Sequence, residues 1–259
     1  MNSVTIPHND IAFSREGVGD RAIVFQHGFL DDQYVWNPVI AELTASRYEI
    51  ARLDLAGFGD RSAANGPFTY DRFAADLAAV VDALDKPFVL VGHSMAGPIV
   101  ELVAAGRHDR ALGVVLLSPI PMAGARTPDE AFEMFRSLGE IGPEHLRGFR
   151  QQTAPLAPED ELDRLVAVAE KLRPEVVRTV ADVWNNGHPA CERPSGFSGP
   201  LLVLPGGEDV LVTAEVVASA VVARFPSANI TVNVIDKAGH WPPPRATLRR
   251  SRCDQWILS

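Results

Sequence analysis

Ser94 stands in the stretch Gly92-His93-Ser94-Met95-Ala96, which follows the apolar run Phe88–Val91 and precedes an apolar helical pattern. A serine between a strand and a helix, with small residues two positions before and two positions after it, is typical of a nucleophile elbow. Gly92 and Ala96 occupy those positions, where the sharp turn leaves no room for bulk. The pattern therefore predicts that Ser94 is a nucleophile.

A serine hydroxyl reacts poorly until a neighbouring base takes its proton. His240 is the best candidate for that base because it follows the predicted strand Ile230–Ile235, and Gly239 before it allows a tight loop. His188, in a loop earlier in the chain, is the alternative. We expect His93 to be a packing residue, since adjacent side chains in a tight turn point apart.

A third group must orient the base. The loop after Leu201–Pro205 offers Glu208 and Asp209, and we favour Asp209 because it lies deeper in the loop. Glu208 is expected to be solvated or to cap the following segment. The end of the preceding strand, at Ser118-Pro119-Ile120, carries no carboxylate, which also favours Asp209.

The elements that must position these residues alternate between strands and helices. Expected strands are Val4–Ile6, Ile11–Arg15, Arg21–Gln26, Tyr48–Leu53, Phe88–Val91, Leu112–Leu117, Leu201–Leu204 and Ile230–Ile235. Expected helices between them are Tyr34–Ser46, Tyr70–Leu84, one from the elbow to about Ala105, Ala214–Phe225 and about Ala246–Leu258. This alternation predicts an α/β fold with a doubly wound, mostly parallel sheet, in which reactive groups gather at the carboxyl ends of the strands.

The alternation breaks between Pro121 and Gly199, where only helical signals occur. Four helices are expected there, each starting near a proline that suits a first helical turn: Pro128–Leu138, Pro143–Gln151, Pro158–Lys171 and Pro174–Asn185. We interpret residues 121–199 as a helical cap, or lid, inserted into a core made of residues 1–120 and 200–259.

Nearly the whole chain resembles the α/β-hydrolase fold proteins of the lid-bearing, single-domain esterase type. The order Ser94, Asp209, His240 is that of the catalytic triad in this fold. The resemblance rests on five motifs that follow predicted strands, namely His27-Gly28-Phe29, Asp54–Gly59, Gly92–Gly97, Gly206–Asp209 and Gly239–Trp241. These motifs are specific for the fold and triad and weakly specific for the substrate.

The resemblance also implies how the remaining motifs serve the site. The backbone N–H groups of Phe29 and Met95 would form an oxyanion hole, and His27 would shape the loop beside it. Asp54–Gly59 resembles the family's Asp-x-x-Gly-x-Gly turn, but Arg61 stands where a serine is usual. The local structure of this turn therefore remains open.

Apolar side chains near these motifs and in the cap predict an apolar, medium-sized acyl or alcohol group in the substrate. The candidate pocket residues are Phe29, Leu30, Met95, Met122, Phe132, Phe135, Phe149, Trp184 and Trp241. Asp31 and Asp32 follow the oxyanion loop, and we expect this pair to cap the helix that begins near Tyr34.

The leading hypothesis is a cofactor-free serine hydrolase that cleaves a carboxylic ester, lactone or thioester through an acyl-enzyme. Carbon–carbon bond hydrolysis and the perhydrolase chemistry sometimes called non-haem haloperoxidase use the same triad and are the alternatives. A third hypothesis is a relative that binds a ligand without catalysis. Family members that open epoxides or displace halide have an aspartate at the elbow, so Ser94 argues against both reactions.

Composition excludes several other classes. The 259 residues are 46% hydrophobic and 22% charged, with a net charge of −9, which disfavours a nucleic-acid partner. No signal peptide, run of about 18 apolar residues, or nucleotide-binding glycine motif is present, so we expect a cytoplasmic protein without membrane spans. We expect Cys191 and Cys253 to be free thiols, and we expect a small-molecule substrate but no metal or cofactor.

Overall fold

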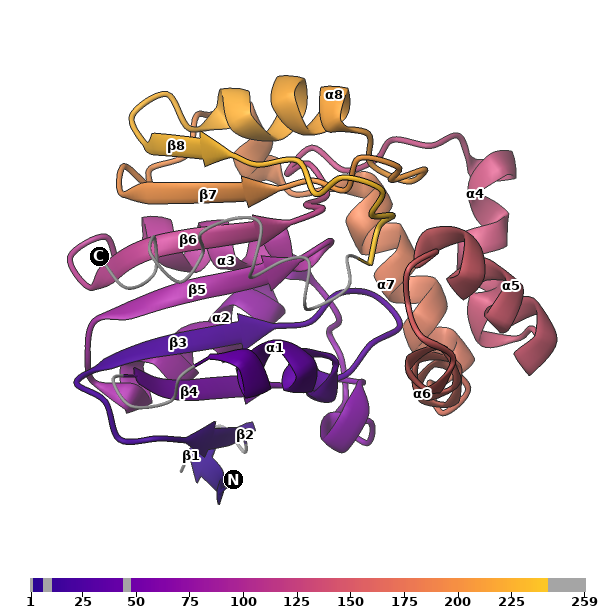
Figure 1. Cartoon of the computed structure of the whole chain (residues 1–259), viewed down its shortest axis with the longest axis horizontal. Coiled ribbons are helices and arrows are strands. Elements are labelled where there is room, and N and C mark those ends of the chain that lie inside the picture. The colour runs from indigo at the N-terminus through magenta and orange to yellow at the C-terminus, as the bar shows by residue number, and fades with distance from the viewer. Residues whose placement is uncertain (1, 7–10, 44–47, 242–259) are drawn as a thin grey trace.

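The computed structural model describes residues 2–6, 11–43 and 48–241. In this part of the chain a single sheet has the strand order β1-β2-β4-β3-β5-β6-β7-β8 (Figure 1). The strands are β1 (Asn2–Ile6), β2 (Ile11–Glu16), β3 (Arg21–Gln26), β4 (Tyr48–Leu53), β5 (Phe88–His93), β6 (Ala111–Leu117), β7 (Pro200–Leu204) and β8 (Asn229–Val232). Strand β2 pairs antiparallel with β1 and β4, and every later pair is parallel, which confirms the predicted fold class.

Helices cover both faces of the sheet, and the side chains of strand β3 pack against both layers. Side chains of successive strand residues point to opposite faces. Ala22 and Val24 pack with the helices α2 (Tyr70–Leu84) and α3 (Ala96–Ala105) on one face. Ile23 and Phe25 pack on the other face with Trp36 and Val39, from the short helix η1 (Gln33–Trp36) and from α1 (Asn37–Glu42). Burial on both faces explains why the parallel strands read as continuous apolar runs.

Four helices lie beyond the carboxyl ends of the parallel strands, to the right of the sheet in Figure 1. They are α4 (Asp129–Arg136), α5 (Pro143–Thr153), α6 (Glu159–Ala169) and α7 (Pro174–Asn186), with the short helix η3 (Ser137–Gly139) after α4. Each begins within one residue of the predicted start. The four helices therefore lie next to the carboxyl ends of the strands, where the proposed reactive groups are found.

The chain from Ala214 to Arg224 departs from the predicted single helix. Thr213 caps its start by accepting a hydrogen bond from the Val216 amide at 3.3 Å. The turns then change from α8 (Ala214–Val216) to a π-helical turn, η5 (Val217–Val221), and a 3₁₀ turn, η6 (Val222–Arg224). Its apolar side chains still pack on the α2 and α3 face of the sheet.

Strand β8 is shorter than predicted, ending at Val232 instead of Ile235. Its neighbour β7 is followed by Pro205, which has no N–H to donate to a ladder. The pairing continues through single contacts, such as the hydrogen bond from the Ile235 amide to the Pro205 carbonyl at 2.9 Å. The last predicted helix, about Ala246–Leu258, lies outside the described residues, as does Cys253.

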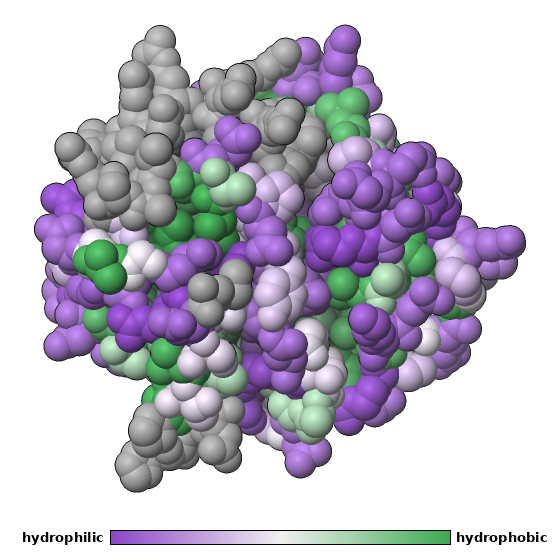
Figure 2. All heavy atoms as spheres, turned by 60° about the horizontal axis from the view of Figure 1, so that its bottom comes forward, coloured by the Kyte–Doolittle hydropathy of each residue, from purple (hydrophilic) through white to green (hydrophobic). Residues whose placement is uncertain are grey.

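No helix in the described ranges is both long and apolar enough to cross a membrane. The face of the molecule in Figure 2 is mostly hydrophilic, and its hydrophobic residues appear in small separate groups.

Candidate active site

Ser94 lies on a strained turn between β5 and α3. Its backbone has φ of 56°, in the left-handed region that costs free energy for a residue other than glycine. The Ser94 amide donates to the Leu117 carbonyl at 2.9 Å, and its own carbonyl accepts from the Ile120 amide at 3.1 Å. A Cβ at Gly92 would lie 2.9 Å from the Ala96 carbonyl oxygen, so the turn requires glycine there.

The structure brings Ser94, His240 and Asp209 into one hydrogen-bonded chain. Ser94 Oγ lies 2.8 Å from His240 Nε2, and His240 Nδ1 lies 2.8 Å from Asp209 Oδ2. All three side chains are buried. Because a carboxylate only accepts, Nδ1 carries the hydrogen, and Nε2 is left to accept the hydroxyl hydrogen of Ser94.

Asp209 is fixed by the loop that follows β7. Its Oδ1 accepts hydrogen bonds from the amides of Leu211 at 2.8 Å and Val212 at 2.9 Å, which leaves Oδ2 for His240. Burial alone would raise the pKa of this carboxyl, but the attraction and hydrogen bond of His240, with the two amides, hold the pKa below its usual value. Asp209 is thus the charged partner of the histidine, whereas the side chain of Glu208 is exposed.

The loop His27-Gly28-Phe29 lies directly against the elbow. A Cβ at Gly28 would come within 3.1 Å of Ser94 Cβ and within 3.0 Å of the His93 carbonyl oxygen. Within the described residues, neither the Phe29 amide nor the Met95 amide has a hydrogen-bond acceptor. An oxyanion hole requires backbone amides that have no other acceptor, so the role of these two amides stays a prediction.

Comparisons with known proteins show the family to which the chain belongs. A family model described as "Alpha/beta hydrolase family" matches residues 23–248. The chain belongs to the alpha/beta hydrolase family. It is 30% identical to a pimeloyl-[acyl-carrier protein] methyl ester esterase of Cronobacter sakazakii, over 90% of this chain and 91% of that protein. The match to lipase LipV of Mycobacterium tuberculosis, at 32% identity, spans only 50% of this chain and 49% of that lipase.

Solved structures give the same fold. A thermophilic esterase from Thermogutta terrifontis aligns over 100% of this hydrolase and 98% of its own chain, with a TM-score of 0.78 and 25% identity. A bromoperoxidase from Bacillus anthracis aligns over 99% and 98% of the two chains, with a TM-score of 0.81 and 20% identity. The predicted superfamily and the predicted class of enzyme, a hydrolase, are therefore confirmed.

The pocket of this hydrolase at Ser94 has a volume of about 60 Å³. Its lining is largely apolar and consists of Phe29, Ser94, Ile120, Ala125, Thr127, Phe135, Phe149, Trp184, Leu211, His240 and Trp241. Of the predicted pocket residues, Phe29, Phe135, Phe149, Trp184 and Trp241 lie in this lining.

Leu30, Met95, Met122 and Phe132 lie outside that lining, although sequence reasoning placed them at the substrate. All four are buried by protein. Phe132 packs behind Trp184, with ring centroids 4.8 Å apart, so it supports the wall without forming it. Met122 holds the chain after α7 through its carbonyl, which accepts from the His188 amide at 2.8 Å.

Four lining residues were missed, namely Ile120, Ala125, Thr127 and Leu211. Leu211 offered a positional signal, because it follows Asp209 in the same loop. Thr127 offered none: its amide is held by Asn185 Oδ1 at 2.9 Å, across 58 residues of sequence. His188, the alternative base, instead contacts Asp71 through Nε2 at 3.0 Å and takes no part in the hydrogen-bonded chain at Ser94.

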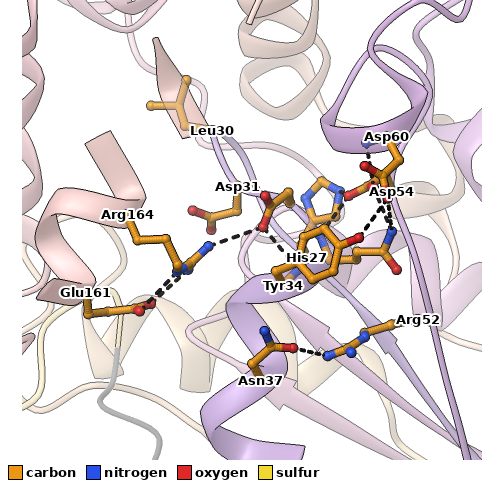
Figure 3. Close-up of polar contacts among 12 residues, drawn as sticks. His27, Leu30, Asp31, Tyr34, Asn37, Arg52, Asp54, Asp60, Glu161 and Arg164 are labelled. Atoms are coloured by element: carbon orange, nitrogen blue, oxygen red, sulfur yellow. Dashed lines mark hydrogen bonds and ion pairs between the residues drawn. The ribbon is translucent and has the colours of Figure 1, made fainter. Parts of the chain in front are cut away.

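His27 and Asp54 shape the loop beside the pocket. His27 donates from Nδ1 to the Gly28 carbonyl at 2.8 Å and accepts at Nε2 from the Leu55 amide at 3.0 Å. Asp54 accepts hydrogen bonds from Gln33 and from the Asp60 amide, close to where Tyr34 donates to Asp60 (Figure 3).

Arg61 stabilises the turn in which the family usually has a serine. It donates to the Asp54 carbonyl at 2.9 Å and pairs with Asp76 of α2 at 2.6 Å. The turn is therefore held by a buried ion pair to a core helix. Among the residues that the structure describes, no group of three or more His, Cys, Asp or Glu side chains is arranged to hold a metal ion.

Proposed function

We propose that this chain is a cofactor-independent serine hydrolase that cleaves a carboxylic ester-type bond of an apolar small molecule. The observation that carries the proposal is the hydrogen-bonded chain from Ser94 through His240 to Asp209, with Ser94 and His240 both facing an apolar pocket. The esterases among its relatives support an ester in preference to other carbonyl compounds.

In the proposed reaction, His240 Nε2 takes the proton of Ser94 while Oγ attacks the ester carbonyl carbon. The carbonyl electrons move onto oxygen, and the oxyanion accepts hydrogen bonds from the Phe29 and Met95 amides. When this adduct collapses, the bond to the alcohol oxygen breaks and His240 protonates that oxygen. Water then attacks the acyl-serine by the same steps, which releases the carboxylic acid and restores Ser94.

The pocket limits the group that it holds. A volume of about 60 Å³ corresponds to about two water molecules, given a share of about 30 Å³ each in the liquid. The group held between Phe29, Trp184 and Trp241 is therefore short and apolar, smaller than the medium size predicted from sequence. The rest of the substrate would lie outside the pocket.

Hydrolysis of p-nitrophenyl acetate and butyrate tests the proposal, and assays with and without hydrogen peroxide separate ester hydrolysis from perhydrolysis. Ser94→Ala should lose about 10⁶ in kcat, the scale known for another serine hydrolase. Ser118→Ala is the matched control, because that hydroxyl is also buried near the carboxyl end of a strand but has no hydrogen-bond partner in the described structure. Activity that survives in Ser94→Ala would exclude the acyl-enzyme.

A fluorophosphonate probe gives an independent test, since an activated serine displaces its fluoride and forms a stable phosphonate ester. Wild-type protein should be labelled and Ser94→Ala should not, whereas Ser118→Ala should be labelled at the wild-type rate. Folded wild-type protein that stays unlabelled and inactive would support the ligand-binding alternative instead.

A further inference from the structure

Asp31 and Arg150 form an ion pair that joins the helices beyond the sheet to the oxyanion loop. Arg150 Nη2 lies 3.0 Å from Asp31 Oδ1, and both side chains are fully buried. Arg150 belongs to α5, whereas Asp31 comes two residues after Phe29. Sequence reasoning assigned Asp31 a capping role together with Asp32, but only Asp32 caps η1.

Asp31 also contacts the neighbours of both reacting side chains. Trp241, next to His240, donates from Nε1 to Asp31 Oδ2 at 2.7 Å, and the Arg150 guanidinium lies 4.4 Å from the Trp241 ring centroid. His93, next to Ser94, has Nδ1 3.8 Å from the same carboxylate oxygen. Burial opposes ionisation of Asp31, but Arg150, His93 and the Trp241 hydrogen bond together hold its pKa below the usual value.

The same arginine fixes the peptide that follows Phe29. Leu30 has φ of 64°, a left-handed conformation that is costly for a branched side chain. Such a conformation persists only when its surroundings hold it. Arg150 Nη2 donates to the Leu30 carbonyl at 2.8 Å, so α5 holds the strained residue directly after the proposed oxyanion donor.

Stability alone does not explain this arginine. Its Nε and Nη1 atoms are buried and have no hydrogen-bond partner in the described part of the chain. Burial lowers the pKa of Arg150 in spite of the opposing charge of Asp31. A pair of apolar side chains in place of Arg150 and Asp31 would fill the same space without this cost. The geometry therefore favours a role in orientation.

We propose that Arg150 and Asp31 are positioning residues that hold the Phe29 amide in the oxyanion hole. Helix α5, which carries Arg150, would then affect the rate of the chemical step in addition to covering the pocket. This inference rests on the proposed serine hydrolase function. A donor needed only in the transition state affects kcat, whereas a cover that only holds substrate affects KM.

The first test compares Arg150→Met with Arg164→Met on p-nitrophenyl butyrate. Arg150→Met should lower kcat about 100-fold, the scale of one lost oxyanion donor, with KM changed less than about threefold. Arg164 of α6 pairs with Asp32 at 3.2 Å and with Glu161 (Figure 3), but it has no hydrogen bond to Leu30. Arg164→Met should therefore keep kcat within about twofold.

The second test separates positioning from folding. Arg150→Met leaves the Asp31 carboxylate buried without its partner, so the melting temperature should fall by roughly 6–20 °C. The double variant Asp31→Asn/Arg150→Met buries no unpaired charge and should recover part of that loss. Its kcat should stay low, because the Leu30 carbonyl still lacks its donor. Recovery of kcat together with the melting temperature would overturn the proposal.

The two proposals fail in different ways. If wild-type protein neither hydrolyses the esters nor reacts with a fluorophosphonate, the serine hydrolase function fails and this inference fails with it. If wild-type protein is active and folded Arg150→Met keeps its kcat, only the positioning role is overturned. If Arg150→Met does not fold, the double variant decides: kcat near the wild-type value would overturn the role, and a loss of about 100-fold would support it.

Discussion

Nε2 of His93 donates a hydrogen bond to the backbone carbonyl of His240, at 2.9 Å. The two residues are neighbours in space because His93 precedes the proposed nucleophile and His240 is the proposed base. This hydrogen bond fixes the loop that carries His240 against the elbow that carries Ser94. Because the carbonyl only accepts, Nε2 of His93 carries a hydrogen. Burial, followed by the effect of His240, lowers the pKa of His93 to about 4.

His93 should make the fold less stable in mild acid. An unfolded chain protonates this histidine near pH 6.5, but the native state does so only near pH 4. Between these values the unfolded state binds more protons, so the free energy of unfolding falls as the pH falls. The loss amounts to at most about 3 kcal/mol. Urea unfolding at pH 7.5 and 4.5 should show a smaller difference for His93→Gln than for wild type; equal differences would contradict the assignment.

Replacing His93 should also slow the reaction without removing any triad residue. In His93→Ala the His240 loop loses its hydrogen bond to the elbow, and a displacement of about 1 Å at the base costs about 100-fold in rate. His93→Gln carries a donor that can reach the same carbonyl, and it should keep most of the activity. Steady-state kcat for the two variants checks this, and equal losses would show that the hydrogen bond is not what matters.

Much of the core could be predicted because the local spacing of apolar residues determines whether a segment forms a strand or a helix. Tyr48–Leu53 is a strand and Tyr70–Leu84 a helix with the predicted bounds, since a buried parallel strand and an amphipathic helix each have a distinct apolar period. The elbow was equally readable, because a sharp turn admits only small residues near Ser94. Asp209 and His240 followed from the rule that reactive groups stand after parallel strands.

Contacts between residues far apart in the sequence could not be predicted in this way. Arg150 looked like any arginine on an amphipathic helix, and its partner Asp31 lies 119 residues earlier. His93 looked like a residue that a tight turn directs away from the site. Its role appears only when the loop of His240 is in place, 147 residues later. The pocket lining was partly missed for the same reason, because the packing of α4 and α7 decides which aromatic side chain faces Ser94.

Asp209→Asn should lower kcat by about 10⁴, the scale known for the equivalent change in another triad enzyme. The amides of Leu211 and Val212 hold Asp209 Oδ1, so the asparagine oxygen would stay there and its NH₂ group would face His240. That group cannot accept from Nδ1, and the histidine would then present the wrong tautomer to Ser94. Glu208→Gln, an exposed neighbour, is the control and should keep its activity; the opposite pattern in kcat would reassign the acid.

Gly92→Ala should destabilise the elbow by about 1–3 kcal/mol, as overpacking does. The new Cβ would lie 2.9 Å from both the Ala96 carbonyl oxygen and Val100 Cγ2, where the first turn of α3 cannot move aside. Gly148→Ala in α5 is the matched control, because nothing lies within 4 Å of its Cβ. It should instead stabilise its helix by about 0.5–1 kcal/mol. Urea unfolding should show changes of opposite sign in the free energy of unfolding of the two variants, and a neutral Gly92→Ala would mean that the turn has room for a Cβ.

Trp184 should set the length of the group that the pocket accepts. Its ring lies in the wall, with centroids 5.9 Å from Phe29 and 5.1 Å from Phe135, and its side chain is buried. Trp184→Ala should cost about 3–5 kcal/mol of stability and open space beside Ser94. The ratio of kcat/KM for p-nitrophenyl octanoate to that for acetate should then rise at least about tenfold, since each added methylene that finds room is worth about 0.8 kcal/mol. Phe132→Leu removes bulk behind the same ring without lining the pocket, so it should lower stability and leave the ratio unchanged. If both variants leave the ratio at the wild-type value, the short group is not selected by this wall.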